Sequence, residues 1–272
     1  MNTPRPWTRS WLICLLIVAG CGREATAPPA ATSAPAGPTQ PSVQPTLAAA
    51  QAAPSAAIAA AVANPARPPA DVESDADRKP AETLAFFDVK PGQTVLELVA
   101  GGGYFTELLS RTVGDTGRVI ATREAPERIA NGRLPNVTAA ADQDWGLPPN
   151  SADIVFTALN YHDLINLKVD RTKLLAGVFS ALKPGGLFAV IDHAAEAGSG
   201  TRDVGTLHRV DQAAVVSEIE AAGFEFVASG DLLRNPNDTH TLAVFDPAIR
   251  GKTDCFVLKF RKPVASSTAG GA

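Results

Sequence analysis

Short apolar segments alternate with segments of helical pattern through most of the chain, and this order constrains the fold more than any other feature. Apolar runs of strand length lie at residues 94–98, 118–122, 136–140, 152–159, 187–191, 224–229 and 255–260. Segments with helical character lie between and before them, at residues 79–89, 104–113, 170–182 and 211–222. Strands separated by helices pair in parallel, so we expect an α/β fold with a doubly wound sheet in a single domain.

Composition separates this expected domain from the rest of the chain. The chain has 272 residues, of which 22 are proline, and residues 23–70 are mostly Ala and Pro. That stretch has almost no large apolar side chain and cannot form a core, so it predicts a disordered tether over residues 21–76. The folded domain is then expected at residues 77–263, followed by a disordered tail at residues 264–272.

The N-terminus has the pattern of an export signal. Arg5 and Arg9 precede a continuous apolar run at residues 11–19, which is about half the ~20 residues needed to span a bilayer. The run ends in Val-Ala-Gly-Cys, which resembles the lipobox of bacterial lipoproteins. The resemblance implies a signal peptide at residues 1–20, lipidation of Cys21, and an exported protein anchored to a bacterial membrane and facing the periplasm. An ordinary cleaved signal with an incidental cysteine is the alternative.

A glycine triplet follows the first predicted strand. Gly101, Gly102 and Gly103 separate that strand from the helix at residues 104–113. In doubly wound sheets, ligands bind at the carboxyl ends of the strands, and glycines there allow the backbone to approach a polar or anionic group. The triplet therefore indicates a cofactor loop, although a tight turn without a ligand would have the same sequence.

Four segments in order resemble motifs of the class I S-adenosylmethionine-dependent methyltransferases, including a predicted bacterial group of that superfamily. They are VLELVAGGGY at residues 95–104, the stretch at residues 142–156, LKPGG at residues 182–186 and AAGF at residues 221–224. The resemblance covers nearly all of residues 78–262. It implies the sheet order 3-2-1-4-5-7-6, S-adenosylmethionine as methyl donor, and a small-molecule acceptor.

The resemblance also implies roles for particular residues. Glu97 matches the acid near the amino-acid end of the donor, and Asp142 matches the acid that accepts a hydrogen bond from the adenine amino group. Gly101 and Gly103 match the second and third glycines of the loop. We therefore expect these four residues to bind the cofactor.

Two positions depart from the family pattern. Val99 replaces the first loop glycine, and its Cβ disfavours a positive φ and a close backbone approach. Arg123 stands where the family has an acid that binds the ribose hydroxyls, and Glu124, one position later, is the expected substitute. A guanidinium at position 123 would also suit a phosphorylated nucleotide.

Histidines occur only after the fourth predicted strand, at positions 162, 193, 208 and 240. His162 and His193 follow the fourth and fifth strands and should lie at the active edge of the sheet. Methyl transfer needs a base when the acceptor must lose a proton, and a histidine suits that role near neutral pH. We expect His162 or His193 to be the base and Asp192 to orient it. Capping or hydrogen bonding of loops is the alternative for each histidine.

Oxygen and nitrogen ligands at the same edge leave a divalent metal open as a further alternative. Asn160, Asp163, Asp192 and His193 follow neighbouring strands, and mixed oxygen and nitrogen ligands suit several divalent ions. Their spacing matches no compact metal motif, so a site without a metal is expected.

Three functional interpretations remain open. The chain is a methyltransferase exported as a lipoprotein, a non-catalytic ligand-binding lipoprotein with a methyltransferase fold, or a metal-assisted enzyme that uses the Asp and His residues at the sheet edge. The loops at residues 197–202 and 230–254 are expected to shape the acceptor pocket. A net charge of −4 and the lack of a long basic segment argue against a nucleic-acid partner.

Overall fold

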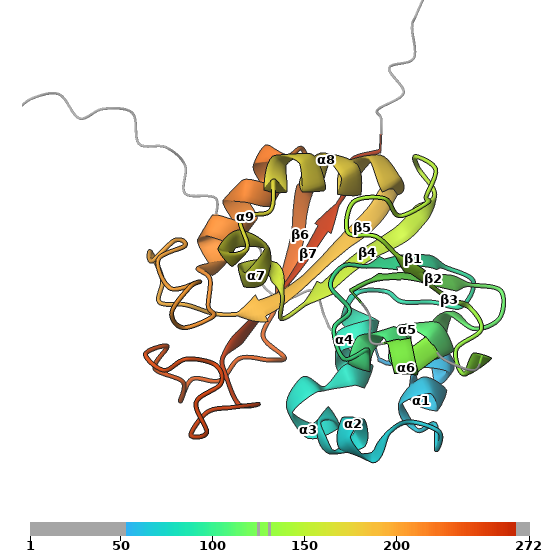
Figure 1. The fold of residues 1–272 in the computed structure, drawn as a ribbon, viewed down its shortest axis with the longest axis horizontal. Coiled ribbons are helices and arrows are strands. Elements are labelled where there is room, and N and C mark those ends of the chain that lie inside the picture. The colour runs from blue at the N-terminus through green and yellow to red at the C-terminus, as the bar shows by residue number, and fades with distance from the viewer. Residues whose placement is uncertain (1–52, 124–125, 130–131, 265–272) are drawn as a thin grey trace, which may run out of the picture. The chain divides into compact units, whose positions relative to one another are not determined.

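The structure is a computed structural model that describes residues 53–123, 126–129 and 132–264 (Figure 1). The chain divides into two units, residues 1–43 and 44–272, and every described residue belongs to the second. The predicted signal peptide, Cys21, the tether up to residue 52, Glu124 and the end of the tail lie outside the described residues. Within the described ranges, no helix has both the length and the apolar character needed to cross a membrane.

One mixed sheet organises the described chain and confirms the expected α/β fold. Its order is β3-β2-β1-β4-β5-β7-β6, which is the predicted order. The strands are β1 Thr94–Glu97, β2 Arg118–Thr122, β3 Val137–Ala140, β4 Ala152–Ala158, β5 Leu182–His193, β6 Glu225–Gly230 and β7 Cys255–Arg261. The first five strands are parallel, and β7 pairs antiparallel with both β5 and β6. The carboxyl ends of β1, β2, β4 and β5 therefore share one edge.

Helices cover both faces of this sheet (Figure 1). Helices α1 Ala56–Val62, α4 Pro80–Phe86 and α5 Tyr104–Val113 pack on one face. Helices α7 Tyr161–Asn166, α8 Arg171–Ala181 and α9 Gln212–Ala221 pack on the other. The remaining short helices are α2 Pro69–Glu73, α3 Asp75–Arg78 and α6 Pro126–Ile129.

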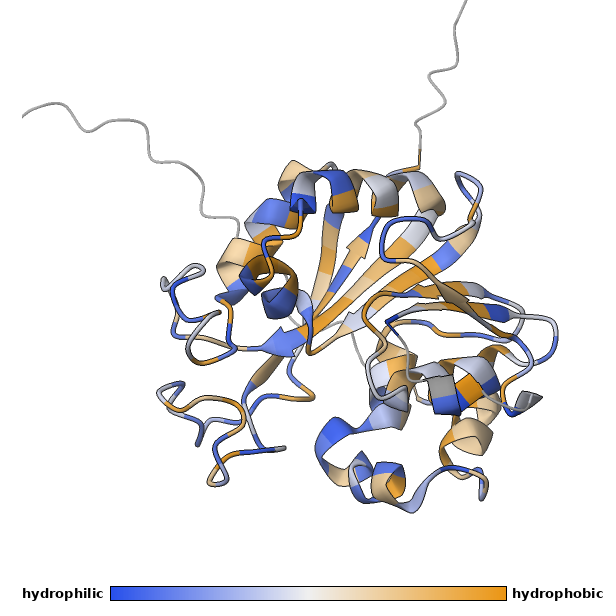
Figure 2. Ribbon diagram, viewed as in Figure 1, coloured by the Kyte–Doolittle hydropathy of each residue, from blue (hydrophilic) through white to orange (hydrophobic). Residues whose placement is uncertain are grey.

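The sequence of β1 shows why two cores form. Val95 packs with the α4 and α5 side chains, its neighbour Leu96 packs with the α7 and α8 side chains, and both are fully buried. A parallel strand covered on both faces is apolar at successive positions, because its side chains alternate between the faces. Figure 2 shows the resulting apolar strands between helices whose outer surfaces are more polar.

The ordered domain begins before residue 77, so the predicted extent of the tether is wrong. Residues 56–78 form α1, α2 and α3. Ser55 accepts a hydrogen bond from Ile58 N and caps α1. Ile58 and Ala61, one turn apart, are 2% exposed, and Ile58 packs into the core that α5 contributes to. The burial of Ile58 and Ala61 stabilises this short helix, because most of the stability of a helix in a protein comes from packing against the rest of the fold.

Candidate functional site

At the edge of the sheet where the carboxyl ends of the parallel strands meet, three residues after strands have positive φ values. Val99, Arg123 and Leu159 follow β1, β2 and β4 and have φ values of 54°, 50° and 61°. Such a conformation is unfavourable for a β-branched residue by about 1–3 kcal/mol. At Val99, the backbone N donates to Thr122 Oγ1 at 2.9 Å, and the carbonyl accepts from Asn160 Nδ2 at 2.8 Å. These two hydrogen bonds stabilise the positive φ of Val99, although a Cβ at this position disfavours it.

The glycine loop is open where a ligand would approach it. Gly101 and Gly103 have φ values of 58° and 75°, and Gly103 is the N-cap residue that precedes α5. A Cβ on Gly103 would lie 2.5 Å from Arg128 Cγ, whereas Gly102 has no atom within 4 Å of that position. The backbone conformation thus favours glycine at 101 and 103, and packing against Arg128 requires it at 103.

Glu97 is buried beneath this loop without a partner for one of its oxygens. Its side chain lies at the end of β1, and no described residue forms a hydrogen bond with Oε2. Burial raises the pKa of Glu97 to about 7, and the neighbouring Thr106 hydroxyl opposes this shift only in part. Glu97 lines a cavity of about 270 Å³ together with Gly101 and Arg78. A cationic amino group in this cavity would supply the missing charge.

The expected nucleotide residues meet in a neighbouring cavity of about 300 Å³, where Asp142 is already paired. Arg123 Nη2 lies 2.6 Å from Asp142 Oδ2, and Arg123 Nε donates to the same carboxylate at 2.8 Å. Both side chains are more than 40% exposed, so the pair contributes about 1 kcal/mol at most. Arg123, which departs from the family pattern, therefore pairs with Asp142, the residue expected to accept a hydrogen bond from adenine. Because the pair is exposed and weak, a bound ligand could displace Arg123 from Asp142.

Asp192 organises the histidines at the end of β5. Its fully buried carboxylate accepts hydrogen bonds from His162 N at 2.6 Å, from His162 Nδ1 at 2.7 Å and from His193 N at 2.8 Å. The His193 ring instead lies 2.8 Å from Thr253 Oγ1 through its Nδ1. Asp192 therefore orients the His162 ring. His162 also lies in α7, where the sequence had suggested a loop.

The two histidines have opposite pKa shifts. Burial lowers the pKa of His193 to about 4, although the charge of Asp192 opposes the shift. Burial acts on His162 in the same direction, but the hydrogen bond and charge of Asp192, with the charge of Asp163, raise its pKa. At neutral pH the His193 ring is uncharged, and His162 is the more basic of the two.

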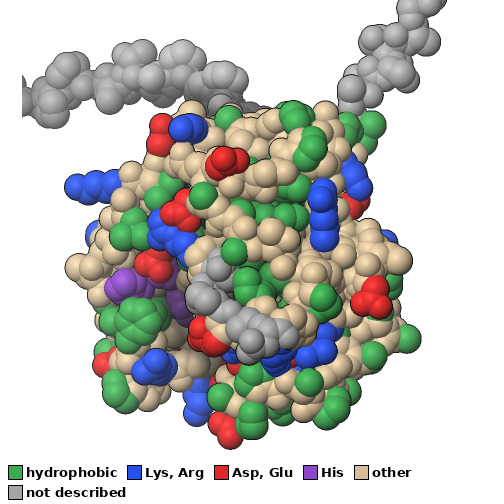
Figure 3. Space-filling view, turned by 45° about the vertical axis from the view of Figure 1, so that its right-hand side comes forward, with side chains coloured by type: hydrophobic (Ala, Val, Ile, Leu, Met, Phe, Trp, Pro, Cys, Tyr) green, Lys and Arg blue, Asp and Glu red, His purple; other side chains and the backbone are tan. Residues whose placement is uncertain are grey.

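Both histidines line a cavity of about 610 Å³, and Figure 3 shows histidine side chains gathered beside acidic and hydrophobic ones on this face. The segment at residues 230–254 contributes Leu233, Phe245 and Arg250 to its wall. Residues 197–202 do not line it. The Gly198 and Gly200 amides of that loop donate to Asp211, the residue that caps α9.

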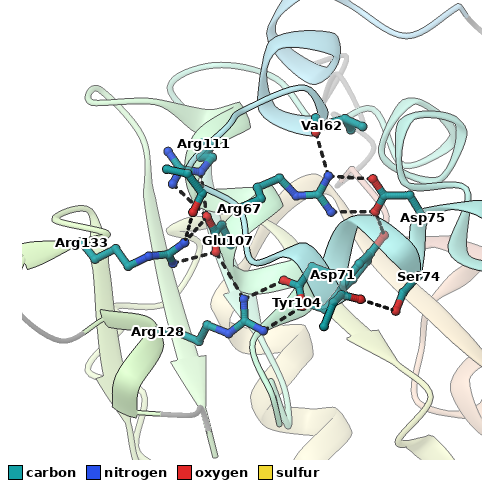
Figure 4. A network of polar contacts seen from close by, with 12 residues as sticks. Val62, Arg67, Asp71, Ser74, Asp75, Tyr104, Glu107, Arg111, Arg128 and Arg133 are labelled. Atoms are coloured by element: carbon teal, nitrogen blue, oxygen red, sulfur yellow. Dashed lines mark hydrogen bonds and ion pairs between the residues drawn. The ribbon is translucent and has the colours of Figure 1, made fainter.

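Sequence reasoning missed the contribution of the segment at residues 67–78 to this site. Arg78 lines both the Glu97 cavity and the histidine cavity. Figure 4 shows how the segment is held: Arg67 pairs with Asp75 at 2.6 Å, Asp75 accepts from the Tyr104 hydroxyl at 2.6 Å, and Asp71 pairs with Arg128 at 2.6 Å. Four acids within residues 71–77 contrast with the Ala/Pro stretch before them, and this contrast was the available signal.

The predicted metal ligands do not form a ligand set. Asn160 Nδ2 donates to the carbonyls of Val99 and Ala158, so its amide is committed to the backbone. Asp192 is committed to the two histidines, and the His193 ring to Thr253.

The sheet order, the glycine loop after β1 and the buried acid at the end of β1 agree with what the resemblance to class I S-adenosylmethionine-dependent methyltransferases implies. Residues 96–190 match the family model described as a methyltransferase domain. A solved S-adenosylmethionine-dependent methyltransferase from Aquifex aeolicus shares the fold, with a TM-score of 0.51 and 23% identity over 71% of this chain and 93% of that one. The likeness to the solved structure shows the fold, and the family model places a methyltransferase domain within it.

Two curated relatives match over part of the chain. The ubiquinone/menaquinone biosynthesis C-methyltransferase UbiE of Hydrogenovibrio crunogenus is 29% identical over 114 residues, which are 38% of this chain and 43% of the relative. An uncharacterized methyltransferase of Synechocystis is 32% identical over 117 residues, or 42% and 51%. The chain thus spans about half the length of these relatives.

Proposed function

We propose that the chain is an S-adenosylmethionine-dependent methyltransferase that acts on a small-molecule acceptor. The observation that carries this proposal is the unpartnered carboxylate of Glu97 beneath an open glycine loop, beside a cavity lined by His162 and His193. A cation site and a separate acceptor cavity that share one wall are what methyl transfer between two bound molecules requires.

The residues of the edge fit the parts of the cofactor. Glu97 would accept from the ammonium of its amino-acid end, and the Arg78 guanidinium, in the same cavity, would bind its carboxylate. Gly101 allows the backbone to approach, and the Arg123–Asp142 pair would open to receive the nucleoside. When bound, the cofactor supplies a methyl group on a sulfonium.

The histidine cavity supplies the acceptor side of the reaction. Asp192 fixes the His162 ring through Nδ1, which leaves Nε2 to take a proton from an acceptor hydroxyl or acidic carbon. Phe105 and Phe245 give the cavity apolar surface. Arg78 and Arg250 contribute positive charge and Asp77 and Asp163 negative charge. The acceptor class that fits is a small, partly apolar molecule with an ionisable group.

Export as a lipoprotein through Cys21 is part of the same proposal. It is supported by the sequence of residues 1–21, where a short apolar run ends in a lipobox-like cysteine. Cys21→Ser should release the protein from the bacterial membrane fraction into the periplasmic fraction. A variant that stays with the membrane would contradict lipidation at this residue.

Calorimetry of the full chain with S-adenosylmethionine tests the enzymatic proposal. We expect one site, with weaker binding after Arg78→Ala and no binding of NADP⁺. Absence of binding at millimolar S-adenosylmethionine would refute the proposal. Such a result would favour a non-catalytic ligand-binding protein, for which the Arg123–Asp142 pair is the supporting observation.

A further inference from the structure

A second arrangement of histidines shares two residues, His162 and Asp163, with the wall of the cavity of about 610 Å³. His162, Asp163 and His208 place one ligand atom each within 4.8 Å of the others, and they are the only such group of three His, Cys, Asp or Glu residues in the described ranges. His162 and Asp163 are neighbours in α7, whereas His208 lies 45 residues further along the chain, in the segment before α9. The proposed methyl transfer uses neither Asp163 nor His208.

The distances within this cluster match the coordination of a metal ion better than hydrogen bonding. His162 Nε2 lies 3.4 Å and His208 Nδ1 lies 3.5 Å from Asp163 Oδ1. Ligands about 2.1 Å from a tetrahedral zinc ion are separated by about 3.4 Å. His208 Nδ1 is a buried atom that forms no hydrogen bond with any described residue. An ion between the three atoms would satisfy it.

Other contacts orient the two histidines as metal ligands are usually oriented. His162 donates its Nδ1 proton to Asp192 at 2.7 Å, which leaves Nε2 free to coordinate. A histidine that binds a metal commonly donates its other ring N–H to a carboxylate in this way. The His208 backbone is fixed by its neighbour Arg209, which is fully buried and bonds to the Ala194 and Leu242 carbonyls at 2.9 and 3.0 Å.

We propose that His162 Nε2, Asp163 Oδ1 and His208 Nδ1 bind one divalent transition-metal ion at the wall of the acceptor cavity. Two imidazoles and one carboxylate suit Zn²⁺, Co²⁺ or Fe²⁺, whereas Mg²⁺ and Ca²⁺ prefer oxygen ligands. Asp163 and Asp192 supply two negative charges close to the ion. Three protein ligands leave a coordination position open towards the cavity that His162 and Asp163 line.

The site gives the acceptor cavity a way to select its ligand. An acceptor with a hydroxyl or carboxylate oxygen could occupy the open position and be held beside the methyl donor. An ion on His162 Nε2 would use the lone pair that the proposed base needs. In the metal-loaded protein the ion would therefore replace the base, because a metal ion lowers the pKa of a hydroxyl bound to it. The metal site can be measured without S-adenosylmethionine, so its failure and the failure of the proposed methyl transfer are distinguishable.

Titration of the full chain with Co²⁺ tests the site directly, since tetrahedral Co²⁺ absorbs visible light far more strongly than the hydrated ion. We expect one equivalent of Co²⁺ with a tetrahedral spectrum, displaced by Zn²⁺ and unaffected by millimolar Mg²⁺. His208→Ala and Asp163→Asn should each weaken binding by at least about tenfold. His208 is 28% exposed in its side chain, so its removal should leave the fold intact, which the thermal midpoint will check.

His240→Ala is the matched control, because His240 also contacts an acid, Asp254 at 3.0 Å, but lies outside the cluster. It should bind Co²⁺ as the wild type does. The proposal is overturned if the wild type takes up no stoichiometric Co²⁺ or Zn²⁺. It is overturned equally if folded His208→Ala and Asp163→Asn proteins bind Co²⁺ with unchanged affinity, or if His240→Ala loses the ion as they do.

Discussion

Replacing Glu97 by glutamine removes an ionisable group that is buried beneath the glycine loop, and so tests how its titration affects stability. The folded chain keeps the Glu97 proton up to a pKa of about 7, whereas an ordinary glutamate, as in the unfolded chain, loses it above 4.5. A difference of this size corresponds to about 3 kcal/mol. The contribution of Glu97 to stability is therefore complete below pH 4.5 and is lost as the pH rises towards 7.

Urea denaturation of the full chain at pH 5 and pH 8 measures this effect. Between these values the wild-type free energy of unfolding should fall by up to about 3 kcal/mol through Glu97. Glu97→Gln has no proton to lose, so its stability should match the wild type near pH 5 and exceed it at pH 8. Glu82→Gln, at an exposed position in α4, is the matched control and should keep the wild-type pH dependence. Parallel pH profiles for wild type and Glu97→Gln would refute the reasoning.

The same substitution separates a structural role for Glu97 from a role in binding. The ammonium of S-adenosylmethionine would stabilise the ionised carboxylate, so binding should release a proton below pH 7 and tighten by up to about tenfold per pH unit there. Glu97→Gln should bind more weakly and without this pH dependence. A variant that is more stable at pH 8 yet binds as the wild type does would show that Glu97 does not contact the cofactor.

Three further substitutions test other parts of the edge. Arg123→Ala frees its acidic partner and should tighten S-adenosylmethionine binding by up to about fivefold in calorimetry, because the exposed pair contributes about 1 kcal/mol at most. Gly103→Ala should reduce the free energy of unfolding by about 1–3 kcal/mol in urea, since its φ is 75° and Arg128 lies in the way, whereas Gly102→Ala should have little effect. Arg67→Ala should expose the N-terminal helices to limited proteolysis and weaken cofactor binding, because the wild-type guanidinium is fully buried in its ion pair. Unchanged values in any of these assays would contradict the corresponding contact.

Strand positions followed from the sequence because they depend on local pattern, whereas the sheet order followed only from the resemblance to a known family. An apolar run between helical segments predicts a strand of a parallel sheet that is covered by helices on both faces. Val95 and Leu96, which are successive and both fully buried, show this covering. The six-residue helix α7 was missed because it is too short to show a helical period, which left His162 in an expected loop.

Side-chain contacts between residues far apart in the sequence could not be predicted, because they depend on which segments the fold brings together at the carboxyl edge of the sheet. Arg123 and Asp142 are 19 residues apart and meet only because β2 and β3 are adjacent in the sheet. His208 reaches α7 through a segment that the buried Arg209 fixes. In the sequence the four histidines differ only in position, whereas in the structure their hydrogen-bond partners give them different chemistry.

The early start of the domain has a consequence for the site itself. The segment at residues 67–78 is docked to α6 by the Asp71–Arg128 ion pair and to α5 by the hydrogen bond from Tyr104 to Asp75, and it carries Arg78 to the wall shared by the cofactor and acceptor cavities. A chain that begins at residue 77 would retain Arg78 but lose the Arg67–Asp75 and Asp71–Arg128 pairs that position α3. Removal of Asp71 would leave the half-buried Arg128 guanidinium without this partner, which is destabilising. The cofactor site is therefore built partly by a segment that the sequence analysis had assigned to the tether.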